Sequence, residues 1–111
     1  MATVSNLFVD AGTNYSNIIS VAATNGQPLN LTGYTVASQM RKSYQSSTAY
    51  TFACSVYDAA NGKIRMQLDP SQSGAIPAGR WLYDVEITSP SGTKTRVVEG
   101  IVTVTPEITQ I

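Results

Sequence analysis

Apolar and polar residues alternate along most of this chain with a period of two. Four runs show the alternation clearly, over residues 34–40, 50–56, 64–68 and 81–87. Strict alternation is typical of strands that bury one face and expose the other, as in antiparallel sheets. The pattern therefore predicts four half-buried strands. The residues assigned to their buried faces are Tyr34, Val36, Phe52, Val56, Ile64, Met66, Leu68, Val85 and Ile87.

Turn-forming residues separate these runs, and further strands are expected over roughly residues 4–10, 15–23 and 94–104. About seven short strands divided by turns predict an all-β fold, specifically an antiparallel two-sheet Ig-like β-sandwich. At most one short helical turn is expected, near residues 70–75. There Asp69 can cap a helix that has Pro70 at its first position.

Two features of the backbone follow from the glycines and from the last strand. Structural turns are predicted at five glycines, namely Gly26, Gly33, Gly62, Gly79 and Gly92. Gly33 stands just before a strand, which indicates a positive φ or a close backbone approach.

In the last strand the alternation slips, because Val97 and Ile101 are out of phase with Val98, Val102 and Val104. A bulge near residues 99–100 is the favoured explanation, and burial of both faces is the alternative.

Length and charge limit the possible partners. At 111 residues, the chain is expected to form a single domain, residues 1–111. Seven basic and seven acidic side chains cancel, which argues against nucleic acid as a partner. Asp10 is the only charged residue among the first 40. Such a segment can be buried in a subunit interface at low desolvation cost, although N-terminal strands of small β domains are also often uncharged.

The compartment is inferred from the lone Cys54 and from the N-terminus. A small secreted domain usually holds an even set of cysteines, so synthesis in a reducing cytoplasm is expected. The opening MATVSNLF lacks the basic and apolar regions of a signal peptide, and no segment is long enough to span a membrane. The glycosylation-like triplets that begin at Asn14 and Asn30 are therefore interpreted as chance matches, the second one as a turn.

No catalytic, metal-binding or cofactor-binding residues are predicted, and the chain is not expected to be an enzyme. It contains no histidine, so the commonest general base and metal ligand is missing. One cysteine cannot build a zinc site, and no phosphate-binding or nucleophile motif occurs. The loop that contains Asp58 and Asn61 has too few ligands for a dedicated calcium site.

The remaining chemically suggestive residues have simpler interpretations. Asp84 and Glu86 share a strand face, where Glu86 can pair with Arg96 across the turn at residues 89–92. Cys54 falls among apolar positions and is expected in the core. Trp81 and Tyr83 also share an apolar face, which favours core packing over a sugar-stacking platform.

Three segments carry a family resemblance: NGQPLNLTGYTVASQMRKS, DAANGKIRMQLDPSQSGAIPAGRWLYDVEI and RVVEGIVTVTPEIT. Together they cover nearly the whole chain. They resemble small β-sandwich virion structural proteins of tailed bacteriophages, including the N-terminal domain of phage baseplate upper proteins. The resemblance is especially close to small virion proteins of contractile-tailed cyanobacterial phages. It implies a structural role in the virion, as a tail, baseplate, neck or capsid-decoration component, and it assigns no catalytic residue.

Protein–protein docking is the function expected from these observations, with copies of the chain or other virion proteins as partners and the virion as location. Phe8, Ile18, Ile108 and Ile111 are the predicted interface residues; fraying at the C-terminus is the alternative explanation for the last two. A carbohydrate- or host-receptor-binding module remains the second hypothesis, which predicts Trp81 or several tyrosines outside the core. An accessory domain of an enzyme is the third. No small-molecule substrate and no membrane are expected.

Overall fold

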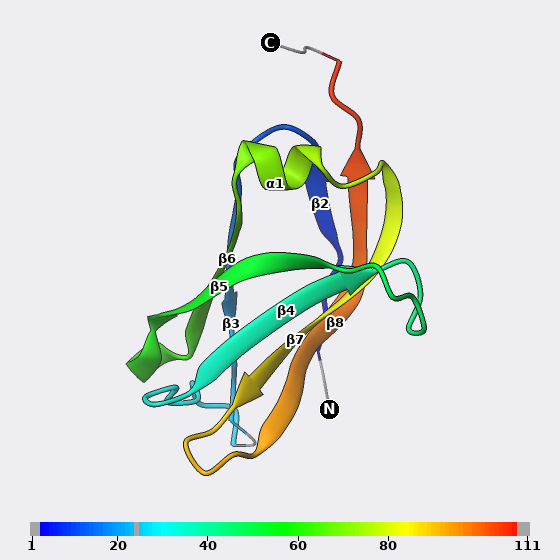
Figure 1. Ribbon diagram of the computed structural model, residues 1–111. Helices are drawn as coiled ribbons and strands as arrows, with labels where there is room; N and C mark the ends of the chain where they lie inside the picture. Colours follow the sequence, from blue (N-terminus) through cyan, green and yellow to red (C-terminus); the bar gives the residue numbers. More distant parts are fainter. Residues whose placement is uncertain (1–2, 24, 109–111) are drawn as a thin grey trace.

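The computed structural model describes residues 3–23 and 25–108 and consists mainly of β-strands (Figure 1). The all-β class is thereby confirmed. The elements are β1 (Thr3–Val4), β2 (Leu7–Asp10), β3 (Tyr15–Ser20), β4 (Thr35–Arg41), β5 (Tyr50–Asp58), the 3-10 turn η1 (Ala59–Asn61), β6 (Lys63–Leu68), α1 (Pro70–Gly74), β7 (Gly79–Thr88) and β8 (Lys94–Thr105).

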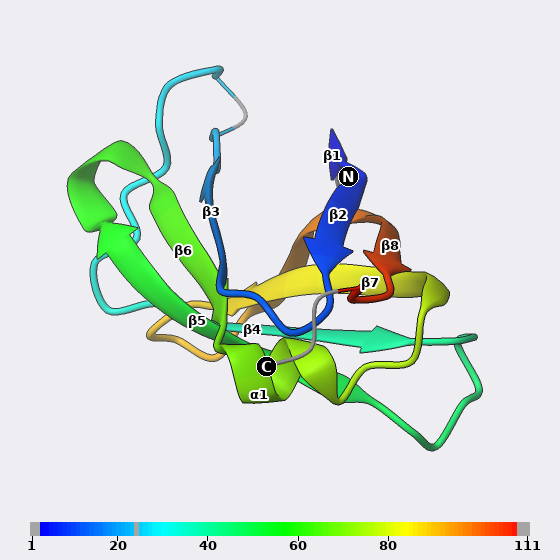
Figure 2. The ribbon, with the colours of Figure 1, turned by 90° about the horizontal axis from the view of Figure 1, so that it is seen from above.

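The strands form one continuous sheet in the order β1-β8-β7-β4-β5-β6-β3, and β2 also pairs with β8. Viewed from above, this sheet curls into a half-barrel, with β2 and β3 on either side of its open side (Figure 2). β1 and β2 run parallel to β8, whereas the other strand pairs in the described part are antiparallel. A single mixed sheet thus takes the place of the expected two-sheet, antiparallel Ig-like sandwich.

β5 explains why the strands join into one sheet. Its residues 50–52 pair with β4, while residues 53–58 pair with β6. A strand that changes partners along its length turns a corner and links what would otherwise be two packed layers. The alternation of apolar residues along β5 reports only which face is buried, so it contains no sign of this change of partner.

β8 contains the predicted bulge at a different place. Val85 pairs with Val98 and Glu86 pairs with Arg96, so the extra residue on β8 is Val97. The bulge lies two to three residues before the expected site at residues 99–100. Because a bulge shifts the strand by one residue, Arg96 is moved to the same outer face as Glu86.

The concave side of the sheet holds the core, which contains two clusters of buried residues. The larger cluster includes Phe52, Met66, Leu68 and Val85, and the smaller one is formed by Val21, Leu31, Ile64 and Ile87. Of the nine residues predicted to be buried, these two clusters hold six; the other three, Tyr34, Val36 and Val56, are partly buried against the smaller one. The inner face of each alternating strand was therefore predicted correctly.

The short helix α1 crosses from β6 to β7, as the sequence predicted. The Asp69 carboxylate accepts the backbone N–H of Gln72 at 2.7 Å, and the Gln72 side chain accepts the N–H of Asp69 at 2.8 Å. This reciprocal capping box satisfies two backbone donors that a helix start leaves free. It also keeps the pKa of Asp69 below its usual value, mainly through the hydrogen bond from Gln72.

The segment around Asn30 is a turn, as interpreted from the sequence. The Asn30 side-chain oxygen accepts the backbone N–H of Thr32 at 3.0 Å and its hydroxyl at 2.6 Å. Gly33 follows with φ = +80°, and a Cβ atom there would lie 2.8 Å from Pro90. The other four glycines assigned to turns also have positive φ, at Gly26, Gly62, Gly79 and Gly92.

Candidate interaction surfaces

The predicted interface residues are exposed, but they lie on different parts of the sheet. Phe8 is 71% exposed on β2, and Ile18 is 43% exposed on β3. Ile108 is 97% exposed and follows β8 in a segment that extends away from the sheet (Figure 1). Ile111 lies outside the described residues. Phe8 and Ile18 thus mark the two edges of the half-barrel.

The outer face of the sheet has a shallow hollow of about 430 Å³ between the connection after β4 and strand β1. Exposed apolar side chains contribute to it, namely Val4, Tyr44 and Ile101. The charged residues Arg41, Asp84, Glu86, Arg96 and Glu99 also line it. A hollow that combines apolar and charged groups fits a polar partner surface better than an apolar small molecule.

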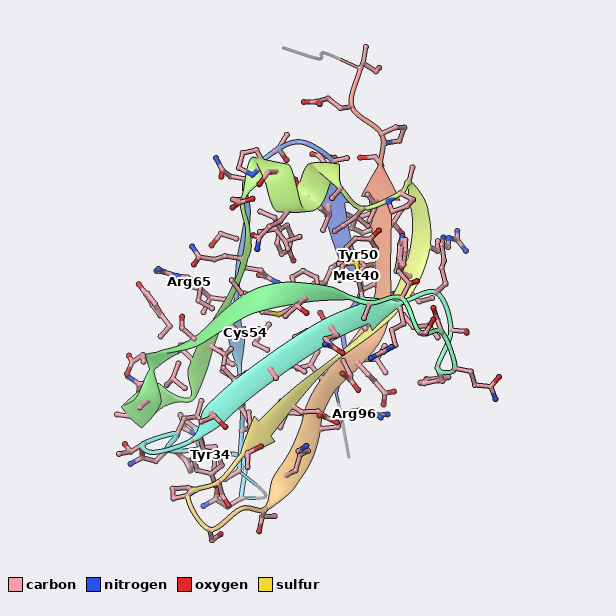
Figure 3. The ribbon with its side chains drawn as sticks, viewed as in Figure 1. Tyr34, Met40, Tyr50, Cys54, Arg65 and Arg96 are labelled. Atoms are coloured by element: carbon pink, nitrogen blue, oxygen red, sulfur yellow. The ribbon has the colours of Figure 1, made fainter. Side chains whose placement is uncertain are left out.

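Arg96 organises the charged residues of this outer hollow. The Arg96 side chain is labelled in Figure 3. Its Nε lies 3.1 Å from Asp84 Oδ2, and a guanidinium nitrogen lies 3.8 Å from Glu99 Oε1. Glu86 lies opposite Arg96 in the register, as expected, but the arginine pairs instead with Asp84 of β7 and with Glu99 of its own strand. Glu86 makes no hydrogen bond or ion pair with the described residues. Exposed pairs of this kind contribute about 0–1 kcal/mol each to stability, so they have little structural value.

A second hollow, of about 790 Å³, lies at the open side of the half-barrel. Ser20 at the end of β3 lines one part of it, and Thr3 of β1 and Thr95 of β8 line another. Val21, Leu29, Ile87 and Val97 supply apolar contacts inside it. Arg96 is its only charged lining residue among those described, so this opening is nearly free of charge.

The side chains that were considered as candidates for binding or catalysis have structural roles in this fold. Trp81 and Tyr83 are 3% and 4% exposed, and the Trp81 indole N–H donates to Pro77 O at 3.0 Å. Cys54 is half-buried, and burial raises the pKa of its thiol to about 11, which makes it a poor nucleophile at neutral pH. Asn61 donates to the Asp58 carboxylate at 2.9 Å.

Two broader properties of the described part are relevant to its chemistry. No three His, Cys, Asp or Glu side chains within residues 3–23 and 25–108 come together in a way that could hold a metal ion. No helix within the same residues is long and apolar enough to cross a bilayer.

Sequence reasoning missed the residues that fasten the N-terminal strands to β8. The chain crosses Gly100 between β1 and β2, where Ser5 N–H donates to Glu99 O at 2.9 Å. The Asn6 side chain accepts the N–H of Ile101 at 3.0 Å, and the Tyr83 hydroxyl donates to Ser5 O. A Cβ on Gly100 would collide with the backbone of Ser5. The lone glycine inside an apolar strand was the available signal, and it was interpreted as a bulge.

Comparison with known proteins identifies the fold but no family. No protein-family model and no curated protein sequence matches the chain. Among solved structures, the N-terminal domain of phage TP901-1 ORF48 is similar over 90% of this chain and 84% of that chain, with 15% identity and a TM-score of 0.56. AggA, the major subunit of aggregative adherence fimbriae type I from Escherichia coli, aligns over 90% and 89% of the two chains, with 15% identity and a TM-score of 0.44.

Proposed function

We propose that this chain is a non-enzymatic structural protein of a bacteriophage virion and that it acts by docking to other proteins. The observation that carries the proposal is the fold shared with a phage protein domain over 90% of the chain. The resemblance of the chain's three sequence segments to phage virion proteins points the same way.

The position in the particle would be the tail, the baseplate, the neck or the capsid surface. A contractile-tailed phage of cyanobacteria is the proposed setting, because the three sequence segments resemble small virion proteins of such phages. Synthesis in the host cytoplasm agrees with the single, half-buried Cys54. Copies of the chain or other virion proteins would be the partners, and no cofactor would take part.

Phe8 on β2 is a large exposed side chain that would gain from docking. It is 71% exposed, and complete burial of a phenylalanine contributes about 1.5–3 kcal/mol. Asp10 is the only charged residue among the described residues up to position 40, so few ions would be desolvated near this strand. A contact centred on β2 is therefore energetically favourable for an apolar partner surface.

Complementation of a phage that lacks the gene tests this proposal. Wild-type protein should restore normal particles, whereas Phe8→Lys and a deletion of residues 106–111 should each reduce incorporation at least tenfold. Tyr44→Lys is the control for placing a charge on an exposed aromatic residue, because Tyr44 is 76% exposed and lies in the connection between β4 and β5, outside β2. Circular dichroism must first show that each variant folds. Normal incorporation of both docking variants would overturn the docking site, and normal particles without the gene would overturn the structural role.

A carbohydrate- or receptor-binding module is the second candidate, and Tyr44 is the observation that favours it. An exposed aromatic ring beside carboxylates and arginines could stack on a sugar and bind its hydroxyls. The buried Trp81 argues against this function. Binding to a glycan array that is lost in Tyr44→Ala would support the module, and absence of binding by the wild-type protein would remove it.

A further inference from the structure

β3 is an uncovered edge of the half-barrel that carries none of the usual protection against pairing. Its six residues, Tyr15–Ser20, include no charge and no proline, and the register with β6 is continuous from Tyr15 to Ser20. Natural edge strands are commonly protected by lysines, prolines, bulges or short length. The opposite edge, β2, has only four residues, and the carbonyl of its Asp10 already accepts the backbone N–H of Thr13. β3 is thus the better template for another strand.

The backbone of β3 has a definite set of free hydrogen-bonding groups. Val21 N–H donates to Gly62 O at 2.8 Å, which shows that Val21 points its backbone groups toward the β6 side. Backbone groups alternate in direction along a strand, so those of Tyr15, Asn17 and Ile19 also face β6. The N–H and C=O groups of Ser16, Ile18 and Ser20 face away from the sheet, and no strand in the described part pairs with them.

We propose that this edge binds β3 of a second copy of the chain, antiparallel, about a two-fold axis that passes beside Ile18. The free backbone groups of residues 16, 18 and 20 then pair with those of residues 20, 18 and 16 of the second copy. Two half-barrels become one continuous sheet through this contact. The proposal rests on the proposed docking function, but it concerns association in solution and can be measured without a virion.

A second copy suits this edge because the strand is complementary to itself. Neither copy brings a charge to the contact, and the whole chain has a net charge of zero. More than one register would pair the free backbone groups of the two strands. In the register centred on Ile18, each Ile18 side chain lies opposite Ile18 of the second copy. Ile18 is 43% exposed and is the largest exposed side chain of the strand. Isoleucine pairs across neighbouring strands are favourable, and the serines on either side pair with each other.

The charges nearest to the edge do not oppose the contact. Ile18 lies beside Arg65 of β6, and Ser20 lies beside Lys63. Arg65 stacks on the Tyr57 ring at 4.3 Å, on the side away from β3, and Lys63 Nζ donates to Ser20 Oγ at 2.8 Å. With strands about 4.8 Å apart, the two Arg65 positions would be separated by about 14 Å, beyond the Debye length of about 8 Å. Repulsion between these arginines would therefore be screened at physiological salt.

The contact is small, so the dimer is weak. One strand edge buries less than the roughly 800 Å² per partner of a standard interface. We expect a Kd between about 10 µM and about 1 mM, the range in which many transient contacts fall. In a virion, where copies are held close together, such a contact would be strengthened by the high local concentration.

Sedimentation velocity of the intact chain tests the proposal, over protein concentrations from about 10 µM to about 1 mM. Wild-type protein should show a concentration-dependent rise toward the dimer, and Ile18→Lys should remain monomeric. Ile101→Lys is the matched control, since Ile101 is 37% exposed but lies on β8, inside the sheet. It should dimerise like the wild type. A wild-type monomer at about 1 mM, or equal loss in both variants, would overturn the proposal.

A charge-swap experiment tests the register itself. Ile18→Lys and Ile18→Glu should each be monomeric alone, because like charges face each other at the two-fold axis. An equimolar mixture of the two should recover at least tenfold tighter association than either alone. Ile101→Lys mixed with Ile101→Glu should show no such gain over its components. Absence of recovery in the Ile18 mixture, with both variants folded, would refute the pairing centred on Ile18. Failure here would leave the virion role open, since that role is measured on particles.

Discussion

Gly62→Ala should destabilise the protein far more than the same change at Gly26, although both glycines have positive φ. φ is +67° at Gly62 and +84° at Gly26, so an alanine in either place incurs a left-handed strain of about 1–2 kcal/mol. The entropy that alanine removes from the unfolded chain is also the same in both variants. The two variants therefore differ only in what the new Cβ meets.

At Gly62 the added Cβ would lie 2.5 Å from Val21 O and 2.9 Å from Leu29 O, whereas nothing lies within 4 Å at Gly26. Both neighbours are backbone atoms of the loop that carries Leu31 into the core, where it is 1% exposed. The loop must move, which strains the hydrogen bonds from Val21 to Gly62 and from Leu29 to Val21. Overpacking of this kind costs about 1–3 kcal/mol. We expect a total of about 3–4 kcal/mol at Gly62 and about 1–2 kcal/mol at Gly26.

Urea unfolding followed by tryptophan fluorescence measures this difference. The single Trp81 is buried, so its emission should report the global transition. The difference of about 2 kcal/mol corresponds to roughly 8 °C in melting temperature for a domain of this size. Equal free energies of unfolding, within about 0.5 kcal/mol, would show that the loop does not pack on Gly62 and would refute the reasoning.

Three further predictions follow from other parts of the fold. Gly100→Ala should detach the Ser5 crossing from β8, and faster amide exchange at residues 3–10 would show this; unchanged exchange there would contradict the crossing. Asp69→Ala should lower the melting temperature by removing the helix cap, whereas Ser71→Ala should lower it less, because the Asp69 carboxylate also holds the backbone N–H of Gln72. Burial raises the pKa of Cys54 from its usual 9.0 to about 11. As the pH rises, the unfolded thiol loses its proton first, so the contribution of Cys54 to stability should be constant below pH 9 and fall between pH 9 and 11. Cys54→Ala should show a smaller fall in urea titrations, and an identical fall would mean that the thiol is not desolvated.

The parts of the fold that sequence could predict are those that depend on burial within one strand. Alternation in β4, β6 and β7 reflects a buried concave face. It was interpreted correctly because successive side chains of a strand point to opposite faces, whatever the partner strands are. The corner in β5, the parallel pairing of β2 with β8 and the bulge at Val97 depend on partners far away in the chain. No local pattern encodes those partners.

The interaction surfaces also combine features that local sequence predicts with features that depend on the strand order. Phe8 and Ile18 were proposed as interface residues because Asp10 is the only charged residue among the first 40, and both side chains are exposed. Their location at the two edges of one curled sheet required the strand order. The bulge at Val97 places Arg96 on the same outer face as Asp84 and Glu86, and the arginine forms its ion pair with Asp84. Local sequence thus predicted which residues are exposed, and topology decided which of them lie together.

Quantitative mass spectrometry of purified phage particles tests the central proposal most directly. If the chain is a virion structural protein, particles purified by density gradient should contain it in a fixed copy number. That number should match the symmetry of the capsid, neck, tail or baseplate. Absence of the chain from particles, despite its abundance in the infected-cell lysate from which they were purified, would contradict the proposal.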